Sequence, residues 1–177
     1  HSLGGYMSIH AANLSSGSVK GVIMIDSPIR PPNFDYSIHR SSGPIRKKKT
    51  YPDMGSILER FKLTPDQPTT FSFVLDYIAK HSVEKVNGGY EWKFDDTLFE
   101  KLGFTTMPKN HALDLSCALG YIYGEHSRLV TKPILDYTKS KFKKGTPVIE
   151  IKGAHHHVLL DKPIELVQSI KRIINGW

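Results

Sequence analysis

The first five residues contain a serine that could act as a nucleophile. His1-Ser2-Leu3-Gly4-Gly5 matches the second half of a Gly-x-Ser-x-Gly motif, in which a tight strand-to-helix turn exposes the serine hydroxyl. Gly4 and Gly5 are small enough for a helix to pack closely beneath that turn. Leu3 supplies a backbone N–H next to the nucleophile, where it could stabilise an oxyanion. The alternatives for the pentapeptide are an ordinary glycine-rich turn or a serine that caps a helix.

Three adjacent histidines near the other end of the sequence are candidates for the base that such a serine needs. His155-His156-His157 follow Gly153-Ala154. A serine hydroxyl is a weak nucleophile at neutral pH until a base removes its proton, and histidine is the side chain that most often does so. The run could also be a metal site or a tag remnant. A metal site needs ligands that converge, and a tag normally stands at a terminus, so we favour the base and expect no metal.

Two acidic residues follow apolar runs and are candidates to orient the base. Asp26 closes the run at residues 22–25, and Glu125 follows the run at residues 117–123. A carboxylate in this role holds the imidazole in one tautomer and stabilises the imidazolium. The ordinary alternatives are a turn-capping aspartate before Ser27-Pro28 and a glutamate on the surface.

The spacing of apolar residues predicts an α/β fold. Residues 22–25 and 117–123 are typical of central parallel strands, and residues 147–151 predict a third strand. Helical spacing occurs at residues 4–14, 129–141 and 163–174. This order of elements indicates a parallel sheet with right-handed crossovers.

The middle of the sequence has a different character. Between residues 28 and 109 the pattern predicts helices at residues 56–63, 69–85 and 95–102, and one short strand at residues 90–94. We therefore expect three segments: a core part at residues 1–28, a mostly helical cap or lid at residues 29–112, and a second core part at residues 113–177.

The serine, the acid and the histidine occur in the chain order of the α/β-hydrolase triad, and the sequence resembles that superfamily. The resemblance is carried by residues 1–5, 20–28 and 153–163, with cap-like segments at residues 60–65 and 90–95. It implies an esterase-like serine hydrolase with an inserted helical cap. Because it covers only about the second half of such a fold, we expect that the strands before the serine turn are missing from this chain. The chain would then belong to a longer or cleaved polypeptide and show little activity alone.

The resemblance also implies a role for each candidate residue. Ser2 corresponds to the nucleophile, Leu3 to an oxyanion-hole donor, and His156 to the base, since the superfamily pattern Gly-x-x-His ends in proline seven residues later. The usual position of the acid, Gly-x-x-Asp, holds Ser127 in this sequence. Some branches place the acid after the strand that follows the serine turn, where Asp26 stands. We favour Asp26, and Glu125 is the alternative.

Composition excludes several other classes of protein. With 177 residues, 39% of them hydrophobic, the chain is long and apolar enough for one globular core, and it lacks the roughly 20 apolar residues in a row that a membrane span needs. The net charge of +7 includes the basic run at residues 46–49, which is typical of a solvated surface rather than a nucleic-acid site. Cys117 is the only cysteine, so an internal disulfide is excluded and we expect a cytoplasmic protein.

The expected function is hydrolysis of an ester-like bond in a small molecule with an apolar acyl group. The reaction would pass through an acyl-enzyme on Ser2 and need neither a metal nor an organic cofactor. The alternative is a non-catalytic binding protein with the α/β-hydrolase fold, which the missing acid at its usual place favours. The sequence leaves the oligomeric state open.

Overall fold

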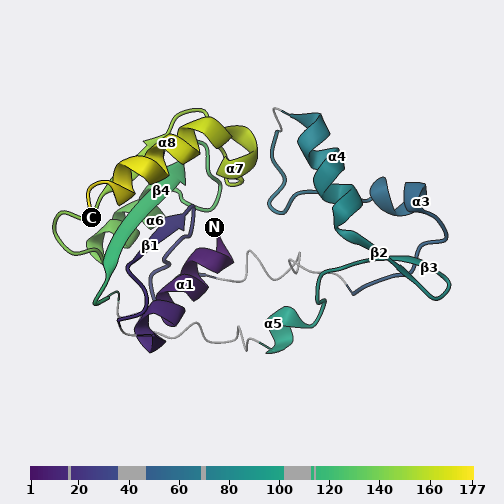
Figure 1. Cartoon of the computed structure of the whole chain (residues 1–177), viewed down its shortest axis with the longest axis horizontal. Helices are drawn as coiled ribbons and strands as arrows, with labels where there is room; N and C mark the ends of the chain where they lie inside the picture. The colour runs from purple at the N-terminus through teal and green to yellow at the C-terminus, as the bar shows by residue number, and fades with distance from the viewer. Residues whose placement is uncertain (16, 36–46, 69–70, 102–112, 114) are drawn as a thin grey trace. The chain divides into compact units, whose positions relative to one another are not determined.

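The computed structural model describes residues 1–15, 17–35, 47–68, 71–101, 113 and 115–177. Three positions of the sequence analysis lie outside these residues: the start of the basic run at Arg46, the start of an expected helix at Thr69, and the end of another at Leu102. The chain divides into two compact units, one formed by His1–Phe34 with Asn110–Trp177 and the other by Asp35–Lys109. Figure 1 shows the helices and strands of both.

A parallel three-stranded sheet forms the centre of the first unit. Its strands are β1 (Gly21–Ile25), β4 (Ala118–Gly124) and β5 (Val148–Ile151), in the order β1-β4-β5. The pairing of Ile25 with Ile122 brings the carboxyl ends of β1 and β4 to the same edge of the sheet. The expected parallel sheet is thus confirmed, and each strand falls on a segment predicted to form one.

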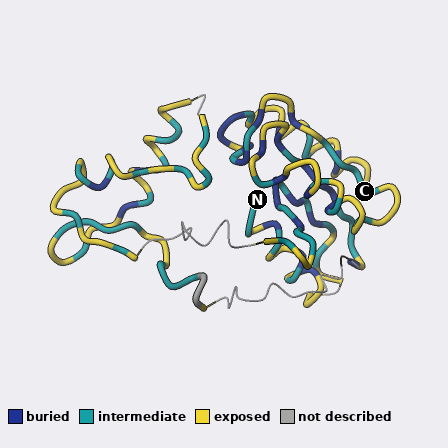
Figure 2. Tube along the Cα trace, turned by 180° about the vertical axis from the view of Figure 1, so that it is seen from behind, coloured by how far each residue is buried: buried dark blue, intermediate teal, exposed yellow. Residues whose placement is uncertain are grey.

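Helices cover both faces of this sheet. Alternate residues of β1 point to opposite faces: Val22 and Met24 belong to one apolar cluster, and Ile23 and Ile25 pack against another. The first cluster includes residues of α1 (Leu3–Leu14) and α6 (Lys132–Ser140), and the second includes residues of α8 (Pro163–Ile174). In Figure 2 the buried positions of this unit lie mainly along the strands and in the segments next to them. The loops after the strands are therefore held on a well-packed scaffold.

The second unit combines short helices with a two-stranded hairpin. Its elements are α3 (Met54–Leu58), α4 (Ser72–His81), β2 (Val83–Val86), β3 (Gly89–Trp92) and α5 (Leu98–Lys101). The described helix α3 is shorter than the helix expected at residues 56–63 and begins two residues earlier, because Asp53 caps it by accepting a hydrogen bond from Ser56 N at 2.8 Å.

The single helix expected at residues 69–85 is wrong at its C-terminal end. The helix α4 ends at His81, and residues 83–86 form the strand β2, which pairs antiparallel with β3. Asn87-Gly88 forms the turn between them, and the positive φ of 91° at Gly88 suits a residue without a side chain. The Asn-Gly pair was the sequence signal for a hairpin at this place.

None of the helices in the described part of the chain has the length and apolar character needed to cross a membrane.

Candidate active site

Ser2 lies in a strained turn at the start of α1. Its φ of 51° and ψ of −125° are rare for a residue with a side chain. Two contacts with the end of β1 hold this conformation: Ser2 N donates to the carbonyl of Ile25 at 2.9 Å, and the Ser2 carbonyl accepts from Ser27 Oγ at 2.7 Å. Backbone strain persists only where neighbouring contacts enforce it, so these two hydrogen bonds are what keep Ser2 in this conformation.

Asp26 follows β1 directly and has no exposed surface. Its carboxylate accepts three hydrogen bonds: Oδ1 from Gly124 N at 2.9 Å, and Oδ2 from Ser127 Oγ at 2.6 Å and from the ring of His156 at 2.7 Å. Burying a carboxylate is costly unless donors replace the lost water. These three donors make the buried position of Asp26 tolerable.

His156 lies in the loop after β5 and is 2% exposed. Its Nδ1 is the ring atom 2.7 Å from Asp26 Oδ2. Because an ionised carboxylate only accepts, Nδ1 carries the proton, and the neutral ring keeps its lone pair at Nε2. His1, the residue before Ser2, donates from its Nε2 to the carbonyl of His156 at 2.8 Å. The structure thereby brings the segments that carry Ser2, Asp26 and His156 together.

Leu3 is the first residue of α1 and follows Ser2 directly. The first backbone N–H groups of a helix have no partner within the helix and point out of its N-terminus. This orientation, together with the partial positive charge of the helix end, suits an N–H that would face an anion beside Ser2.

Glu125, the alternative acid, has other partners. Its carboxylate accepts from Gly153 N at 2.9 Å and from Lys152 Nζ at 3.0 Å. The hydrogen bond from Gly153, followed by that from Lys152, holds the pKa of Glu125 below its usual value. Glu125 thus connects the ends of β4 and β5 on the surface, whereas the carboxylate that contacts His156 is that of Asp26.

Ser127 is a residue whose contact with Asp26 the sequence did not reveal. While it donates to Asp26, its hydroxyl oxygen also accepts from Leu129 N at 3.2 Å and Val130 N at 3.1 Å. These contacts fix the hydroxyl hydrogen toward the carboxylate. The only signal in the sequence was that Ser127 follows β4 at the place where a triad acid usually stands.

Asp161 is a second residue that sequence reasoning missed. It is 3% exposed and accepts from the backbone N of His155 at 2.7 Å, with the His155 ring Nδ1 at 3.2 Å from the same oxygen. Asp161 ends the short helix α7 (Val158–Asp161), so this contact ties α7 back to the loop that carries His156. The histidine run alone gave no sign of this bracing.

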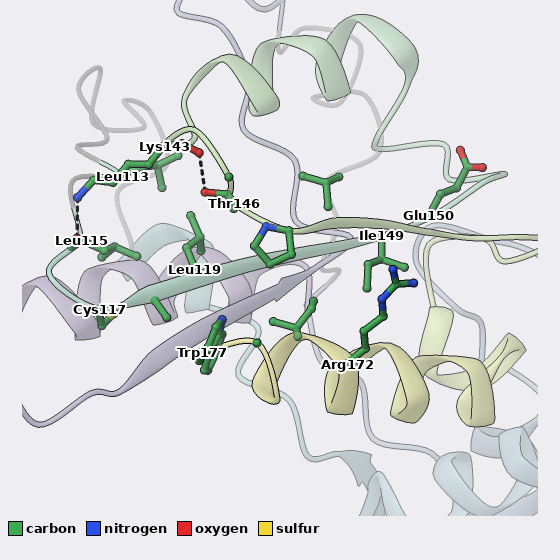
Figure 3. A pocket seen from close by; sticks show the side chains of 16 residues that line it. Leu113, Leu115, Cys117, Leu119, Lys143, Thr146, Ile149, Glu150, Arg172 and Trp177 are labelled. Atoms are coloured by element: carbon green, nitrogen blue, oxygen red, sulfur yellow. Dashed lines mark hydrogen bonds between the residues drawn. The ribbon is translucent and has the colours of Figure 1, made fainter.

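A pocket of about 740 Å³ lies elsewhere in the first unit. Cys117, Leu119, Val148 and Trp177 are among the residues that line it (Figure 3). Its lining includes residues 117–119 at the amino end of β4 and residues 147–150 of β5, but neither Asp26 after β1 nor Gly124 at the carboxyl end of β4. The pocket is therefore separate from the candidate active site.

Comparisons with known proteins identify the fold. No protein-family model and no curated protein matches the sequence. Among solved structures, the chain is similar to E-2-(acetamidomethylene)succinate hydrolase, with a TM-score of 0.77 and 21% identity over 99% of this chain and 65% of that one. It is also similar to a thioesterase domain from the curacin biosynthetic pathway, with a TM-score of 0.73 and 17% identity over 97% of this chain and 64% of that one.

A third similar structure is an esterase from Mycobacterium tuberculosis, with a TM-score of 0.65 and 16% identity over 97% of this chain and 57% of that one. The chain thus spans 65% or less of the length of each of these structures. At such identities the likeness concerns the fold, and the chain has the α/β-hydrolase fold over the part that it covers. The three similar structures named here are those of a hydrolase, a thioesterase domain and an esterase.

Gly4 and Gly5 offer a matched test of the Ser2 turn. A methyl group on Gly5 would collide with Ser27 Oγ and lie 3.0 Å from Ser27 Cβ, whereas one on Gly4 meets nothing within 4 Å. We expect Gly5→Ala to displace Ser27, break its hydrogen bond to the Ser2 carbonyl, and lower the free energy of unfolding by about 1–3 kcal/mol. Gly4→Ala, inside the same helix, should be neutral or stabilise by up to about 1 kcal/mol. Thermal unfolding of both variants measures this difference, and equal melting temperatures would contradict the packing described for Gly5.

Proposed function

We propose that this chain carries the catalytic residues of a serine hydrolase that cleaves an ester-like bond. In this proposal Ser2 is the nucleophile, His156 the general base and Asp26 the acid that orients it. The observation that carries the proposal is the buried 2.7 Å hydrogen bond between His156 Nδ1 and Asp26 Oδ2, next to the strained turn of Ser2. A serine hydroxyl is activated when a turn presents it to an imidazole that a buried carboxylate orients.

Acylation would begin when Ser2 Oγ attacks the carbonyl carbon of the substrate. His156 Nε2 takes the hydroxyl proton as the new C–O bond forms, and the carbonyl oxygen becomes an oxyanion that accepts from Leu3 N. When the oxyanion collapses, the bond to the leaving group breaks, and that group takes the proton back from His156. The acyl group remains on Ser2.

Deacylation repeats these steps with water. His156 removes a proton from water, the resulting hydroxide attacks the acyl carbon, and the bond to Ser2 Oγ breaks as His156 returns the proton to it. Asp26 stabilises the imidazolium present in both steps without taking a proton itself. Every atom is accounted for by the substrate, water and these three side chains.

We further propose that the unit Asp35–Lys109 acts as the cap that selects the acyl group. Within it, several large apolar side chains are exposed, with Phe73 at 69% and Tyr77 at 64%. Exposed apolar side chains that lie next to one another can mark a binding surface, and the rings of Phe71 and Phe73 are 5.9 Å apart. These side chains support a small substrate with an apolar acyl part.

A fluorophosphonate probe tests the proposed chemistry directly. We expect the full-length protein to be labelled at Ser2, because the probe forms a stable bond only with an activated serine. His156→Ala should slow labelling by several orders of magnitude, since it removes the base. Mass spectrometry of the labelled peptide measures both.

The variant Lys132→Gln is the control, because Lys132 is exposed on α6 and forms a surface ion pair with Asp136 at 2.9 Å. It should be labelled at the rate of the unaltered protein. A protein that stays unlabelled, or one whose labelling is unaffected by His156→Ala, would favour a non-catalytic binding protein instead.

The identity of the acid is tested by exchanging carboxylates for amides. Asp26→Asn should lower turnover by about 10⁴-fold, because the amide no longer holds the imidazole in the required tautomer. Glu125→Gln should have little effect, since its carboxylate contacts Gly153 and Lys152. Adding Ser127→Asp to Asp26→Asn should recover part of the lost turnover, because Ser127 lies at the same carboxylate. Steady-state hydrolysis of an activated ester measures all three, and the reverse ranking of the two single variants would refute Asp26 as the acid.

A further inference from the structure

Three imidazole rings meet beside the Ser2 turn. Each of His1, His156 and His157 offers one ring nitrogen, and these three nitrogens all lie within 4.8 Å of one another. The ring centroids of His1 and His156 are 4.7 Å apart, and those of His156 and His157 are 4.8 Å apart. The cluster joins the chain's first segment to the histidine loop, so the run of histidines alone could not reveal it.

The hydrogen bonds around the cluster decide which nitrogens carry lone pairs. His156 donates its Nδ1 proton to Asp26, which leaves Nε2 as the lone-pair nitrogen. His1 donates from Nε2 to the carbonyl of His156, which leaves its Nδ1 as the lone-pair nitrogen. Two of the three rings are thus already held in tautomers that can bind a metal ion.

The contact between Asp26 and His156 has a second consequence. Metal-binding histidines usually donate their other ring N–H to a carboxylate or carbonyl group, which fixes the ring and makes it a better ligand. His156 and His1 both have such an acceptor, the carboxylate of Asp26 and the carbonyl of His156. The donor set of three neutral imidazoles suits Zn²⁺, Co²⁺, Ni²⁺ or Cu²⁺ rather than Mg²⁺ or Ca²⁺.

The spacing of the nitrogens fits this class of ion after a small adjustment. In a tetrahedral site with Zn–N bonds of about 2.0–2.1 Å, two ligand nitrogens lie about 3.4 Å apart. The separations in the cluster must therefore close by up to about 1.4 Å, which would require the half-buried His1 and His157 side chains to rotate. Three protein ligands leave a fourth position open for water or another oxygen.

We propose that His1, His156 and His157 form a reversible inhibitory site for a divalent transition-metal ion such as Zn²⁺. The bound ion would occupy the lone pair of His156 Nε2, the same lone pair that must accept the proton of Ser2. Binding of the metal follows from the cluster alone, and only the inhibition rests on the proposed function. Metal and substrate turnover would then exclude each other at one nitrogen atom.

Calorimetric titration of the full-length protein with Zn²⁺ tests the binding. We expect one ion per chain, with affinity weakened at least about tenfold by His157→Gln and by His1→Gln, because loss of a ligand costs no less than loss of an outer partner. His81→Gln should leave the affinity for Zn²⁺ unchanged, because His81 lies on α4 and is not one of the three clustered histidines. The two ligand variants lie in different segments, so one can serve if the other fails to fold, and Co²⁺ uptake should give the visible absorption bands of tetrahedral coordination.

A fluorophosphonate assay with and without Zn²⁺ separates this inference from the proposed function. We expect Zn²⁺ to slow the labelling of Ser2, and a chelator to restore the original labelling rate. Tight binding that depends on His1 and His157 in a protein that the probe never labels would uphold the metal site and refute the hydrolase. Labelling that Zn²⁺ does not slow, or Zn²⁺ uptake that neither ligand variant weakens, would overturn the inhibitory site and leave the proposed function standing.

Discussion

The candidate site depends on one buried hydrogen bond, from the imidazole of His156 to the carboxylate of Asp26. Neither residue has more than 2% of its surface exposed, so neither can rely on water to stabilise its charge or polarity. The free-energy cost of burying the carboxylate of Asp26 is offset because Gly124 N and Ser127 Oγ also donate to it. This carboxylate raises the pKa of the neighbouring Tyr121 hydroxyl in addition to the larger effect of burial. The contact between Asp26 and His156 orients the imidazole of His156, and with it the direction of Nε2.

The sheet makes the contact possible because the carboxyl ends of β1, β4 and β5 meet at one edge. Asp26 follows β1, and its backbone N donates to the carbonyl of Ile122 on β4 at 2.8 Å, which continues the strand pairing by one residue. Gly124 must be glycine at this edge, since a methyl group there would lie 2.6 Å from the carbonyl oxygen of Ala154 and would meet the next carbonyl as well. The histidine loop therefore packs directly on the backbone of β4.

Much of this arrangement could be predicted from the sequence, and the failures have physical causes. The apolar run before Asp26 and the long run before Gly124 predicted strands correctly, because strands buried on both faces leave a strong local pattern. The helix expected through Lys85 is wrong beyond His81, because residues 83–86 satisfy their backbone hydrogen bonds by pairing with β3 across the Asn87-Gly88 turn. The contacts of Ser127 with Asp26 and of His1 with His157 depend on segments that are far apart in the chain. Their convergence is a tertiary property that no local pattern carries.

Proton NMR of the full-length protein, with the histidine side chains labelled with ¹⁵N, tests the central contact most directly. A proton that an imidazole donates to a buried carboxylate in a short hydrogen bond is strongly deshielded, so we predict a far-downfield resonance for the Nδ1 proton of His156. It should vanish in Asp26→Asn and persist in Glu125→Gln. A resonance that survives Asp26→Asn, or that disappears in Glu125→Gln, would contradict the claim that Asp26 orients His156.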